Sequence, residues 1–580
     1  MHNQERRENA DVQYTLGITY LTSKDGERQT NLEHALGCFR AALDVYTPDA
    51  FSTQWANTQY QLGIVYRELE YGDRQASLRK SLAYLQFSLE VFTRESFPEA
   101  WAQTQYNLGL THIALASKDR YISLQKALIC FQAALKVYNL ETFPEEWANV
   151  QTSLANLYCL LPGDDRQAVL EKAISYYQAA LRVYIAEHYP EEWAQTQHNL
   201  GNVYSFLPDG DRQAQLHKAI ACYQAALRVN TYEQYPREWA ATQHSLGNAY
   251  RNLSQGDIEH NLLNAIRCYE AALRVYTREN TPMDWATVQS SLGLSYNLIA
   301  SDNEQATLAH AIACFEAALQ VYTPKTSPIE WAKTQNMLGL TYLNLPDGKV
   351  QTHLQRAIAC FEATLAVYTR ESFPLGWATV QINLGNAYCN LFEGDQQSYL
   401  QRAIECYEAA LLVYNRKAFP ADWAKLQSNL GTAYSDLTGG DRQAHLKKAI
   451  ACYRASLLVY SSEGTPLDWA ALQFNLGNAY RELLESNRQD NLEHAITCYQ
   501  AALEIYKAET FPFEWAASQN NCGNAYHELL NGDQRINLTH AIACYEAALQ
   551  VFLTLPGQED TIQGLRENLD RAHTDLQILE

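Results

Sequence analysis

Eleven tryptophans divide this sequence at a fixed interval, because each stands 46 residues after the one before it, without an insertion or deletion. They are Trp55, Trp101, Trp147, Trp193, Trp239, Trp285, Trp331, Trp377, Trp423, Trp469 and Trp515. Extending the interval backward reaches Asn9, where the tryptophan is missing but the residues after it keep the pattern. The interval predicts twelve 46-residue units over 9–560, with a polar cap over 1–8 and a capping helix over 561–580.

Each unit carries the pattern of two helices. Counting the tryptophan as position 1, apolar residues fall at positions 1, 8, 12 and 15, the spacing of one helix face. Turn residues follow near position 19, as in Gly210-Asp211-Arg212, where the aspartate is expected to cap a second helix. That helix should end near position 39, and a proline at position 44 should begin the next unit. Every unit is therefore predicted to be a helical hairpin.

The hairpins resemble a known repeat family. Leu200-Gly201-x-x-Tyr204, Ala219-x-x-x-Tyr223-x-x-Ala226 and Pro236 resemble the tetratricopeptide repeat (TPR) signature with longer helices and turns. The usual TPR tryptophan site holds glutamine in all twelve units. The sequence is most similar to the long TPR arrays of cyanobacteria and other bacteria, which often accompany CHAT-type proteases or signalling ATPases. The resemblance implies an all-α, right-handed superhelical solenoid of twelve helical hairpins whose first helices line a concave groove.

Charge and hydropathy restrict the partners. Lys and Arg total 44 against 65 Asp and Glu, a formal net charge of −21, which disfavours general binding to nucleic acid or to an anionic membrane. No run approaches the ~20 apolar residues of a membrane-spanning helix. The first ten residues, MHNQERRENA, have no apolar core of a secretory signal, so we expect a cytoplasmic protein.

The residue types of catalysis and metal binding do not form recognisable sets. Ten of thirteen cysteines stand at position 30 of their units, where neighbours should lie ~10 Å apart, beyond the ~7 Å limit for a disulfide. Cys159 and Cys389, at position 13, should face the groove as accessible thiols, and Cys522 should lie in the core. No CxxC, phosphate-binding glycine loop or HExxH motif occurs. We expect no catalytic residue, metal or cofactor, and therefore no enzyme.

Position 10 of the first helix carries the main candidates for partner binding. Positions 3, 6, 10 and 13 should face the groove, with position 7 at its flank. Asparagine fills position 10 in six units, at Asn156, Asn202, Asn248, Asn386, Asn478 and Asn524. A carboxamide has a donor and an acceptor, as a peptide backbone does, and the resemblance implies that groove asparagines hold peptides. The alternative is that the amides bond neighbouring helices and stiffen the array, which we expect for position 7, as at Asn199.

Other residues of the same face interrupt the row of amides. Position 10 is apolar in the first three units and again in the seventh and eighth. Three position-6 tyrosines should add an exposed aromatic strip near the N-terminus, suited to a partner's helix or hydrophobic segment. Two histidines at position 6 and two arginines at position 13 are further candidate contacts, the arginines for acidic groups. These seven are Tyr14, Tyr60, Tyr106, His198, His244, Arg251 and Arg481.

The sequence therefore predicts a non-enzymatic scaffold for protein–protein interaction that binds peptide or protein segments in a concave groove. Two alternatives remain open. One is a sensor or regulatory subunit of an effector complex, with a CHAT-type protease or a signalling ATPase on a separate chain. The other is self-assembly of the array.

Overall fold

The chain is all-helical and built of repeating hairpins. The computed structural model describes residues 2–23, 25–70, 72–115, 120–163, 165–208, 210–299, 304–346, 349–484 and 487–579. Within these ranges it contains 25 α-helices and no strand. Contacts between residues divide the chain into two compact units, Met1–Asn280 and Thr281–Glu580, here called unit 1 and unit 2.

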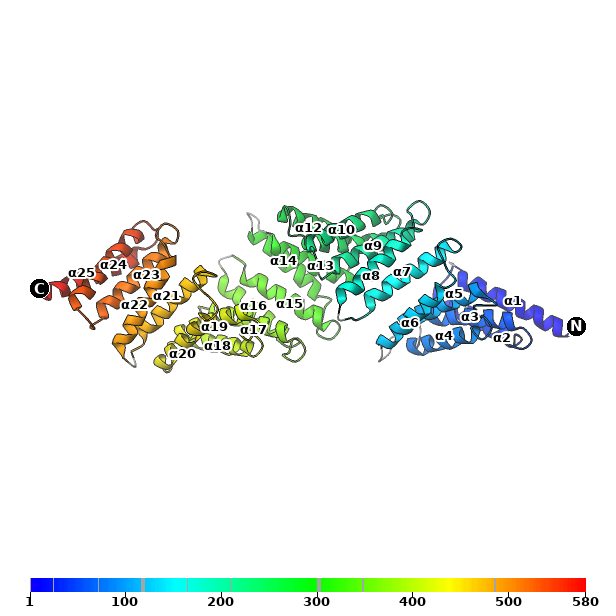
Figure 1. Cartoon of the computed structure of the whole chain (residues 1–580), viewed down its shortest axis with the longest axis horizontal. Coiled ribbons are helices and arrows are strands. Elements are labelled where there is room, and N and C mark those ends of the chain that lie inside the picture. Colours follow the sequence, from blue (N-terminus) through cyan, green and yellow to red (C-terminus); the bar gives the residue numbers. More distant parts are fainter. Residues whose placement is uncertain are drawn as a thin grey trace. The chain divides into compact units, whose positions relative to one another are not determined.

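Unit 1 contains the first six hairpins, in which each odd-numbered helix packs against the next even-numbered one (Figure 1). Its helices are α1 (His2–Thr22), α2 (Arg28–Leu43), α3 (Ser52–Glu68), α4 (Arg74–Ser88), α5 (Pro98–Ala114), α6 (Arg120–Ala134), α7 (Pro144–Leu160), α8 (Arg166–Ala180), α9 (Pro190–Phe206), α10 (Arg212–Ala226), α11 (Pro236–Arg251) and α12 (Ile258–Ala272). The polar residues before Asn9 continue the first helix rather than forming a separate element.

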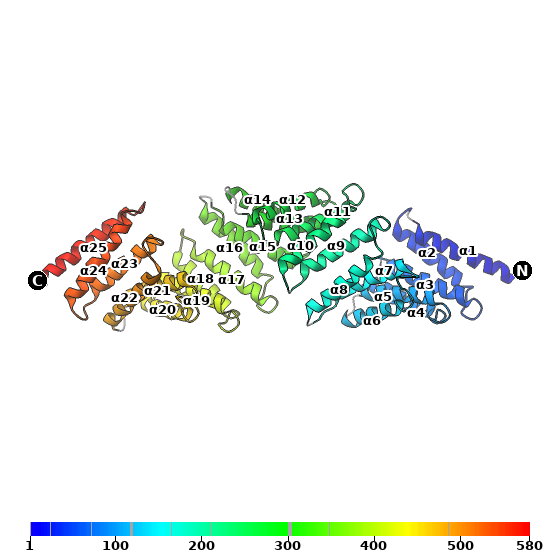
Figure 2. The ribbon, with the colours of Figure 1, turned by 45° about the horizontal axis from the view of Figure 1, so that its top comes forward.

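Unit 2 contains the other six hairpins and one further helix, and its neighbouring hairpins stack side by side (Figure 2). Its helices are α13 (Pro282–Leu298), α14 (Glu304–Leu319), α15 (Pro328–Leu343), α16 (Val350–Leu365), α17 (Pro374–Cys389), α18 (Gln396–Leu411), α19 (Pro420–Asp436), α20 (Arg442–Ser456), α21 (Pro466–Glu482), α22 (Arg488–Ile505), α23 (Pro512–Glu528), α24 (Gln534–Phe552) and α25 (Glu559–Ile578). The last helix packs on α24.

The predicted starts of both helices are confirmed, but most second helices end earlier than the expected position 39: α10, for example, ends at Ala226, position 34, and the chain continues in turns. Gly210 has φ +91°, a left-handed conformation that glycine adopts without strain, and it places Asp211 at the start of α10. The Asp211 carboxylate accepts hydrogen bonds from the backbone N–H groups of Gln213 and Ala214, two donors that have no partner inside the helix. Proline begins the first helix of ten hairpins, where its missing N–H removes no helical bond.

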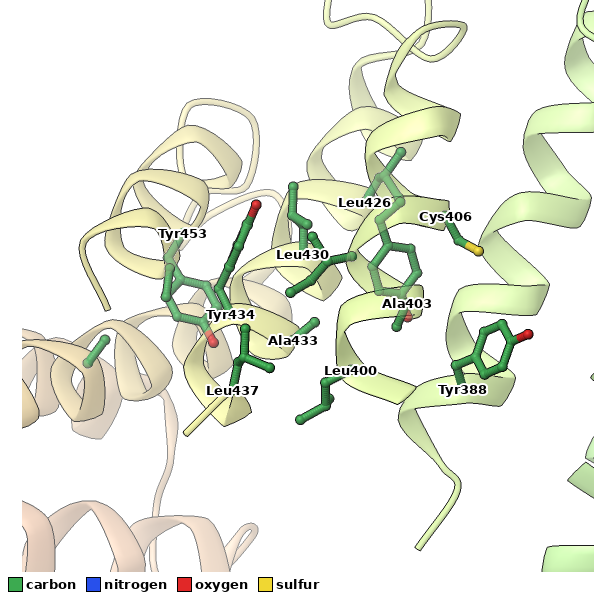
Figure 3. Close-up of a cluster of buried hydrophobic side chains, with 14 of the residues drawn as sticks. Tyr388, Leu400, Ala403, Cys406, Leu426, Leu430, Ala433, Tyr434, Leu437 and Tyr453 are labelled. Atoms are coloured by element: carbon green, nitrogen blue, oxygen red, sulfur yellow. The ribbon is translucent and has the colours of Figure 1, made fainter. Parts of the chain in front are cut away.

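Close contact between the two helices of a hairpin depends on a small residue at position 9, which is glycine in eleven repeats and Ala155 in the fourth. A Cβ atom on Gly201 would lie 2.7 Å from Cε1 of Tyr223, so in this hairpin a larger residue would displace the ring. Leucine and alanine side chains fill the remaining interface. Side chains of the same kinds also fill the interface between consecutive hairpins, as Figure 3 shows for α18 and α19, where Leu400 and Ala403 lie near Leu430 and Ala433. Each fully buried leucine contributes about 1.5–3 kcal/mol relative to an exposed one.

Candidate binding surface on the first helices

The position-10 asparagines all accept a hydrogen bond from a tyrosine of their own hairpin. The donor is the phenol at position 31 of the second helix, 21 residues later. The oxygen-to-oxygen distance is 2.7 Å for Asn202–Tyr223, 2.9 Å for Asn248–Tyr269, and 2.8 Å for Asn386–Tyr407, Asn478–Tyr499 and Asn524–Tyr545. Asn156 pairs with Tyr177 in the same way. Bonding to a neighbouring helix was the alternative that the sequence left open for these amides, and the position-31 tyrosine is the partner that the sequence pattern did not identify.

The pairing holds through all twelve repeats. Where position 31 is phenylalanine or leucine, position 10 is isoleucine or leucine; where position 31 is tyrosine, position 10 is asparagine or threonine. The apolar pairs are Ile18/Phe39, Ile64/Leu85, Leu110/Phe131, Leu294/Phe315 and Leu340/Phe361, and the threonine is Thr432, which accepts from Tyr453 at 3.3 Å. Because a buried hydroxyl without an acceptor is costly, the core residue accounts for the amide and apolar stretches of the first helices.

Some of the amides also join neighbouring repeats. Nδ2 of Asn429 donates to Oδ1 of Asn386 at 3.2 Å, and Nδ2 of Asn521 donates to Oδ1 of Asn478 at 2.9 Å. Both donors stand at position 7, so the predicted bracing role is confirmed for these two. Asn199, the example named from the sequence, instead accepts from Gln195 within α9.

The NH₂ groups of the position-10 amides remain for a ligand. Asn156 is exposed, and the other five are half-buried. Nδ2 of Asn248 lies 3.3 Å from Nε2 of His244. For the other five, no protein group in the described part of the chain accepts from Nδ2. With Oδ1 occupied, the amides can offer donors to a partner but little acceptor capacity.

Two surface cavities bring the predicted amides together. In unit 1, a cavity of about 390 Å³ is lined by Asn156, Asn199 and Asn202 together with Leu160 and Phe206. The Phe206 side chain is 75% exposed, so this cavity has an apolar rim.

In unit 2, a more polar cavity of about 670 Å³ is lined by Thr432, Asn475, Asn478, Arg481 and Asn521, among others. Burial raises the pKa of the Asp436 carboxyl, which lies at its edge. Each cavity joins first-helix residues of consecutive repeats.

The expected aromatic strip is wrong at its centre. Tyr60 is only 7% exposed, because the next repeat covers it and Nδ2 of Asn107 donates to its hydroxyl at 2.9 Å. Tyr14 and Tyr106 are half-buried. The Tyr106 hydroxyl lies 3.2 Å from Oγ of Ser153 in the following repeat.

The two histidines lie against the core tyrosines. The ring centroids of His198 and Tyr223 are 5.6 Å apart, and those of His244 and Tyr269 are 5.7 Å apart. Nδ1 of His198 also lies 3.0 Å from Oγ1 of Thr242. Burial lowers the pKa of both imidazoles to about 4, so they are neutral at physiological pH.

The arginines are only partly available. Nη1 of Arg481 lies 3.8 Å from Oε1 of Glu528 in the next repeat, so this arginine already has an acidic neighbour. Nη1 of Arg251 is buried and has no hydrogen-bond partner among the residues that the structure describes. Their contact with a partner's acidic groups stays a prediction.

The cysteines behave as packing residues. All thirteen are free thiols, and Cys522 lies in the core as expected. Cys159 and Cys389 are only half-exposed, and burial raises the pKa of both thiols, which keeps them protonated. Across the described ranges, no group of three His, Cys, Asp or Glu side chains is placed to hold a metal ion. No described helix is long and apolar enough to cross a membrane.

Comparison with known proteins gives only distant likenesses. No protein-family model matches the chain, and the curated proteins gave no match. Among solved structures, the chain is similar to Cut9 in "Crystal structure of APC/C hetero-tetramer Cut9-Hcn1", at 13% identity and TM-score 0.35 over 97% of this chain and 96% of that one. It is similar to the P58(IPK) TPR domain at 14% identity and TM-score 0.24, over 76% and 99% of the two chains. A circular tandem repeat protein matches at 11% identity and TM-score 0.11, over 99% and 97%. These scores are too low to carry an argument, so the hairpin architecture rests on the chain's own helices.

Proposed function

We propose that this chain is a scaffold that binds protein or peptide segments along the first helices of its hairpins. The observation that carries the proposal is the row of position-10 amides, whose oxygens accept hydrogen bonds from buried tyrosines and three of which, Asn156, Asn202 and Asn478, line surface cavities. The resemblance to TPR arrays, in which the first helices line the binding groove, agrees with this surface.

The fixed orientation determines what the amides recognise. Because the Tyr223 hydroxyl donates to Oδ1 of Asn202, the Asn202 NH₂ is left as a donor. A backbone carbonyl of an extended segment is the matching acceptor. One such bond contributes only about 0.5–1.5 kcal/mol, so useful affinity needs several amides in succession. Consecutive hairpins supply them, and the rim formed by Leu160 and Phe206 offers a place for an apolar side chain of the partner.

The chemistry of the chain is consistent with a cytoplasmic location. Thirteen free cysteines suit a reducing compartment, where thiols persist. The regulatory-subunit alternative stays a hypothesis, since no feature of the described residues identifies a protease or an ATPase as the partner.

Threonine gives a test that keeps the core intact. Thr432 shows that threonine at position 10 still accepts from the tyrosine, while it lacks the NH₂ group. A variant with Asn202→Thr, Asn248→Thr, Asn478→Thr and Asn524→Thr should therefore fold normally and lose only the donors. Its control carries four threonines on exposed faces of second helices, in place of Glu171, His217, Glu405 and Glu493.

The readout is selection of peptides from a displayed library, followed by affinity measurement on the four-threonine variant and its control. We expect the selected peptides to bind the variant at least tenfold more weakly than the wild type, and to bind the control unchanged. Equal affinity for the wild type and the variant, at matched helicity and unfolding temperature, would show that the amides are purely structural.

A further inference from the structure

The fifth repeat breaks a column of buried aromatic residues. Position 38, near the end of each second helix, is tyrosine in nine repeats, phenylalanine in two and asparagine only at Asn230. In the fourth repeat the ring of Tyr184 is buried and packs against the aromatic residue at position 43, Tyr189, with ring centroids 5.6 Å apart. The phenol at position 38 also reaches the first helix, as in Tyr322–Thr287 at 2.7 Å and Tyr138 to the Glu99 carbonyl at 3.5 Å.

A cavity of about 420 Å³ occupies the corresponding place in the fifth repeat. Glu191 and Gln195 line it, and they hold the same repeat positions as Glu99 and Thr287. Tyr235, the position-43 residue, has no ring at position 38 to pack on. Its hydroxyl instead donates to Oε1 of Glu191 at 2.7 Å, and the side chain lines the cavity. The shorter asparagine therefore leaves open the space that a tyrosine fills elsewhere.

Two polar side chains at this cavity lack the partners that burial requires. Asn230 is only 6% exposed, yet no described residue forms a hydrogen bond with its carboxamide. Oγ1 of Thr152 is buried and also has no partner within the described ranges. Because leaving a buried amide unpaired is costly, a ligand in the cavity that bonds to the Asn230 carboxamide is favoured, whereas Oγ1 of Thr152 is too enclosed to reach it.

The charge of the lining identifies the kind of ligand. Three carboxylates line the cavity, from Glu191, Glu192 and Glu238, and no lysine or arginine does. None of the three forms an ion pair with another residue that the structure describes. Glutamates in the first turn of a helix are stabilised by the helix dipole and need no ligand to explain them. Their position around Asn230 is what indicates that a ligand of this cavity carries positive charge.

Aromatic side chains complete the lining. Tyr106, Tyr184 and Tyr235 contribute rings, whose faces attract organic cations. The three glutamates are not placed close enough together to hold one metal ion, and no other such group occurs among the described residues.

We propose that this cavity binds an organic cation, an alkylammonium or guanidinium group, whose N–H donors meet the glutamates and the Asn230 carbonyl. The cation is either a lysine or arginine side chain of a bound protein or a free amine. The cavity shares Asn156 with the position-10 amides, but none of the groups that meet the cation belongs to them, so the inference adds to the proposed function and does not depend on it.

The test is a ligand-observed NMR titration of the full chain at low ionic strength with n-butylammonium, n-butylguanidinium and neutral n-butanol. Two variants accompany the wild type. Asn230→Tyr restores the residue of nine other repeats and fills the cavity, and Glu192→Gln with Glu238→Gln removes charge but little volume. We expect both cations to bind at least fivefold more tightly than butanol, and both variants to weaken the cations at least fivefold.

A second arm identifies the source of the cation. Binding of a capped Ala-Lys-Ala peptide, but not Ala-Gln-Ala, would identify a protein side chain, whereas binding of 1,4-diaminobutane alone would identify a free amine. The proposal is overturned if butanol binds with the same affinity as the cations, or if the cations bind Asn230→Tyr with the affinity of the wild type. If Asn230→Tyr does not fold, the glutamate variant alone decides, and its unchanged affinity has the same meaning.

Discussion

The eighth and ninth hairpins share one backbone plan but differ, among other positions, at the pair formed by positions 10 and 31. In the eighth, Phe361 packs beneath Leu340. In the ninth, the ring at the same position is Tyr407, and its hydroxyl donates to Asn386 at 2.8 Å. The glycine at position 9 contacts the ring in both hairpins. One hydroxyl in the core therefore accompanies the change of a surface residue from leucine to asparagine.

This difference shows that part of the first-helix surface is determined from inside the hairpin. A phenol without an acceptor, or an amide against a phenyl ring, leaves a polar group unsatisfied. The apolar and amide stretches of position 10 therefore follow the core ring, and a position-10 amide is present only where the core supplies tyrosine. The glycine at position 9 is common to both hairpins, whereas the residues at positions 10 and 31 change together.

The largest expected effect concerns the feature that both hairpins share. A Cβ on Gly339 would lie 2.7 Å from Cε1 of Phe361, and one on Gly385 would lie 2.6 Å from Cε1 of Tyr407. Gly339→Ala and Gly385→Ala should each lower the free energy of unfolding by about 1–3 kcal/mol, because the ring must shift to make room, whereas the fourth hairpin is already built around Ala155. Urea denaturation measures this. The control is Gly37→Ala in α2, where no atom lies within 4 Å of the added carbon. A gain of about 0.5–1 kcal/mol is expected there, and a similar gain at Gly385 would contradict the clash.

The matched pair should be exchangeable only as a pair. Phe361→Tyr places a hydroxyl near Leu340 and Leu343, and we expect a loss of about 2 kcal/mol because position 10 offers no acceptor. Adding Leu340→Asn should recover most of this loss. In the ninth hairpin, Asn386→Leu should cost a similar amount and Tyr407→Phe should restore it. A double-mutant cycle from denaturation curves measures the coupling, and additive single effects would refute the pairing.

Acid should weaken the two tyrosine-containing hairpins that carry a histidine at position 6. Burial lowers the pKa of His198 and His244 to about 4, against about 6.5 in the unfolded chain. Between about pH 6.5 and about pH 4 the unfolded state binds protons that the folded state does not. The free energy of unfolding therefore decreases as the pH is lowered through this range. We expect about 2 kcal/mol of this loss per histidine to disappear in His198→Phe with His244→Phe, and the double variant should fold because phenylalanine occupies the equivalent position at Phe474. Urea denaturation at pH 7.5 and at pH 5 measures the decrease in the free energy of unfolding. If the double variant shows the same decrease as the wild type, protonation of these histidines is not its cause.

The fold could be predicted from the sequence because its determinants are local and repeated. The interval between tryptophans, the aspartate at the start of the second helix and the proline at the start of the first each act within one unit. Repetition then makes one correct hairpin into twelve, as the 25 observed helices confirm.

The candidate site could be predicted only in part, because helix periodicity assigns a direction and not a partner. It placed Asn202 on the first-helix surface, where it lines a cavity, but not its bond to Tyr223 on the other helix. It also placed Tyr60 in the open, although the following repeat covers it. Both errors concern packing between helices. The agreement of positions 10 and 31 in every repeat, and the single asparagine at Asn230, were visible in the sequence and become meaningful once the helices are paired.

The smallest expected effect concerns the bonds between repeats. Nδ2 of Asn521 donates to Asn478 in the preceding hairpin, whereas Asn475 has no hydrogen-bond partner in the described part of the chain. Asn521→Ala should therefore lower the free energy of unfolding by about 0.5–1 kcal/mol, while Asn475→Ala should leave it within about 0.5 kcal/mol of the wild type. Because Asn478 keeps its bond from Tyr499, the loss measures the contact between repeats alone. Hydrogen exchange of α21 and α23 gives a second readout, since a weakened contact should raise exchange in both helices only in Asn521→Ala. Equal effects of the two substitutions would mean that the position-7 asparagines affect stability through helix propensity and not through bonds between repeats. The bonds from the position-31 tyrosines to the position-10 asparagines would then be the specific polar contacts of these amides.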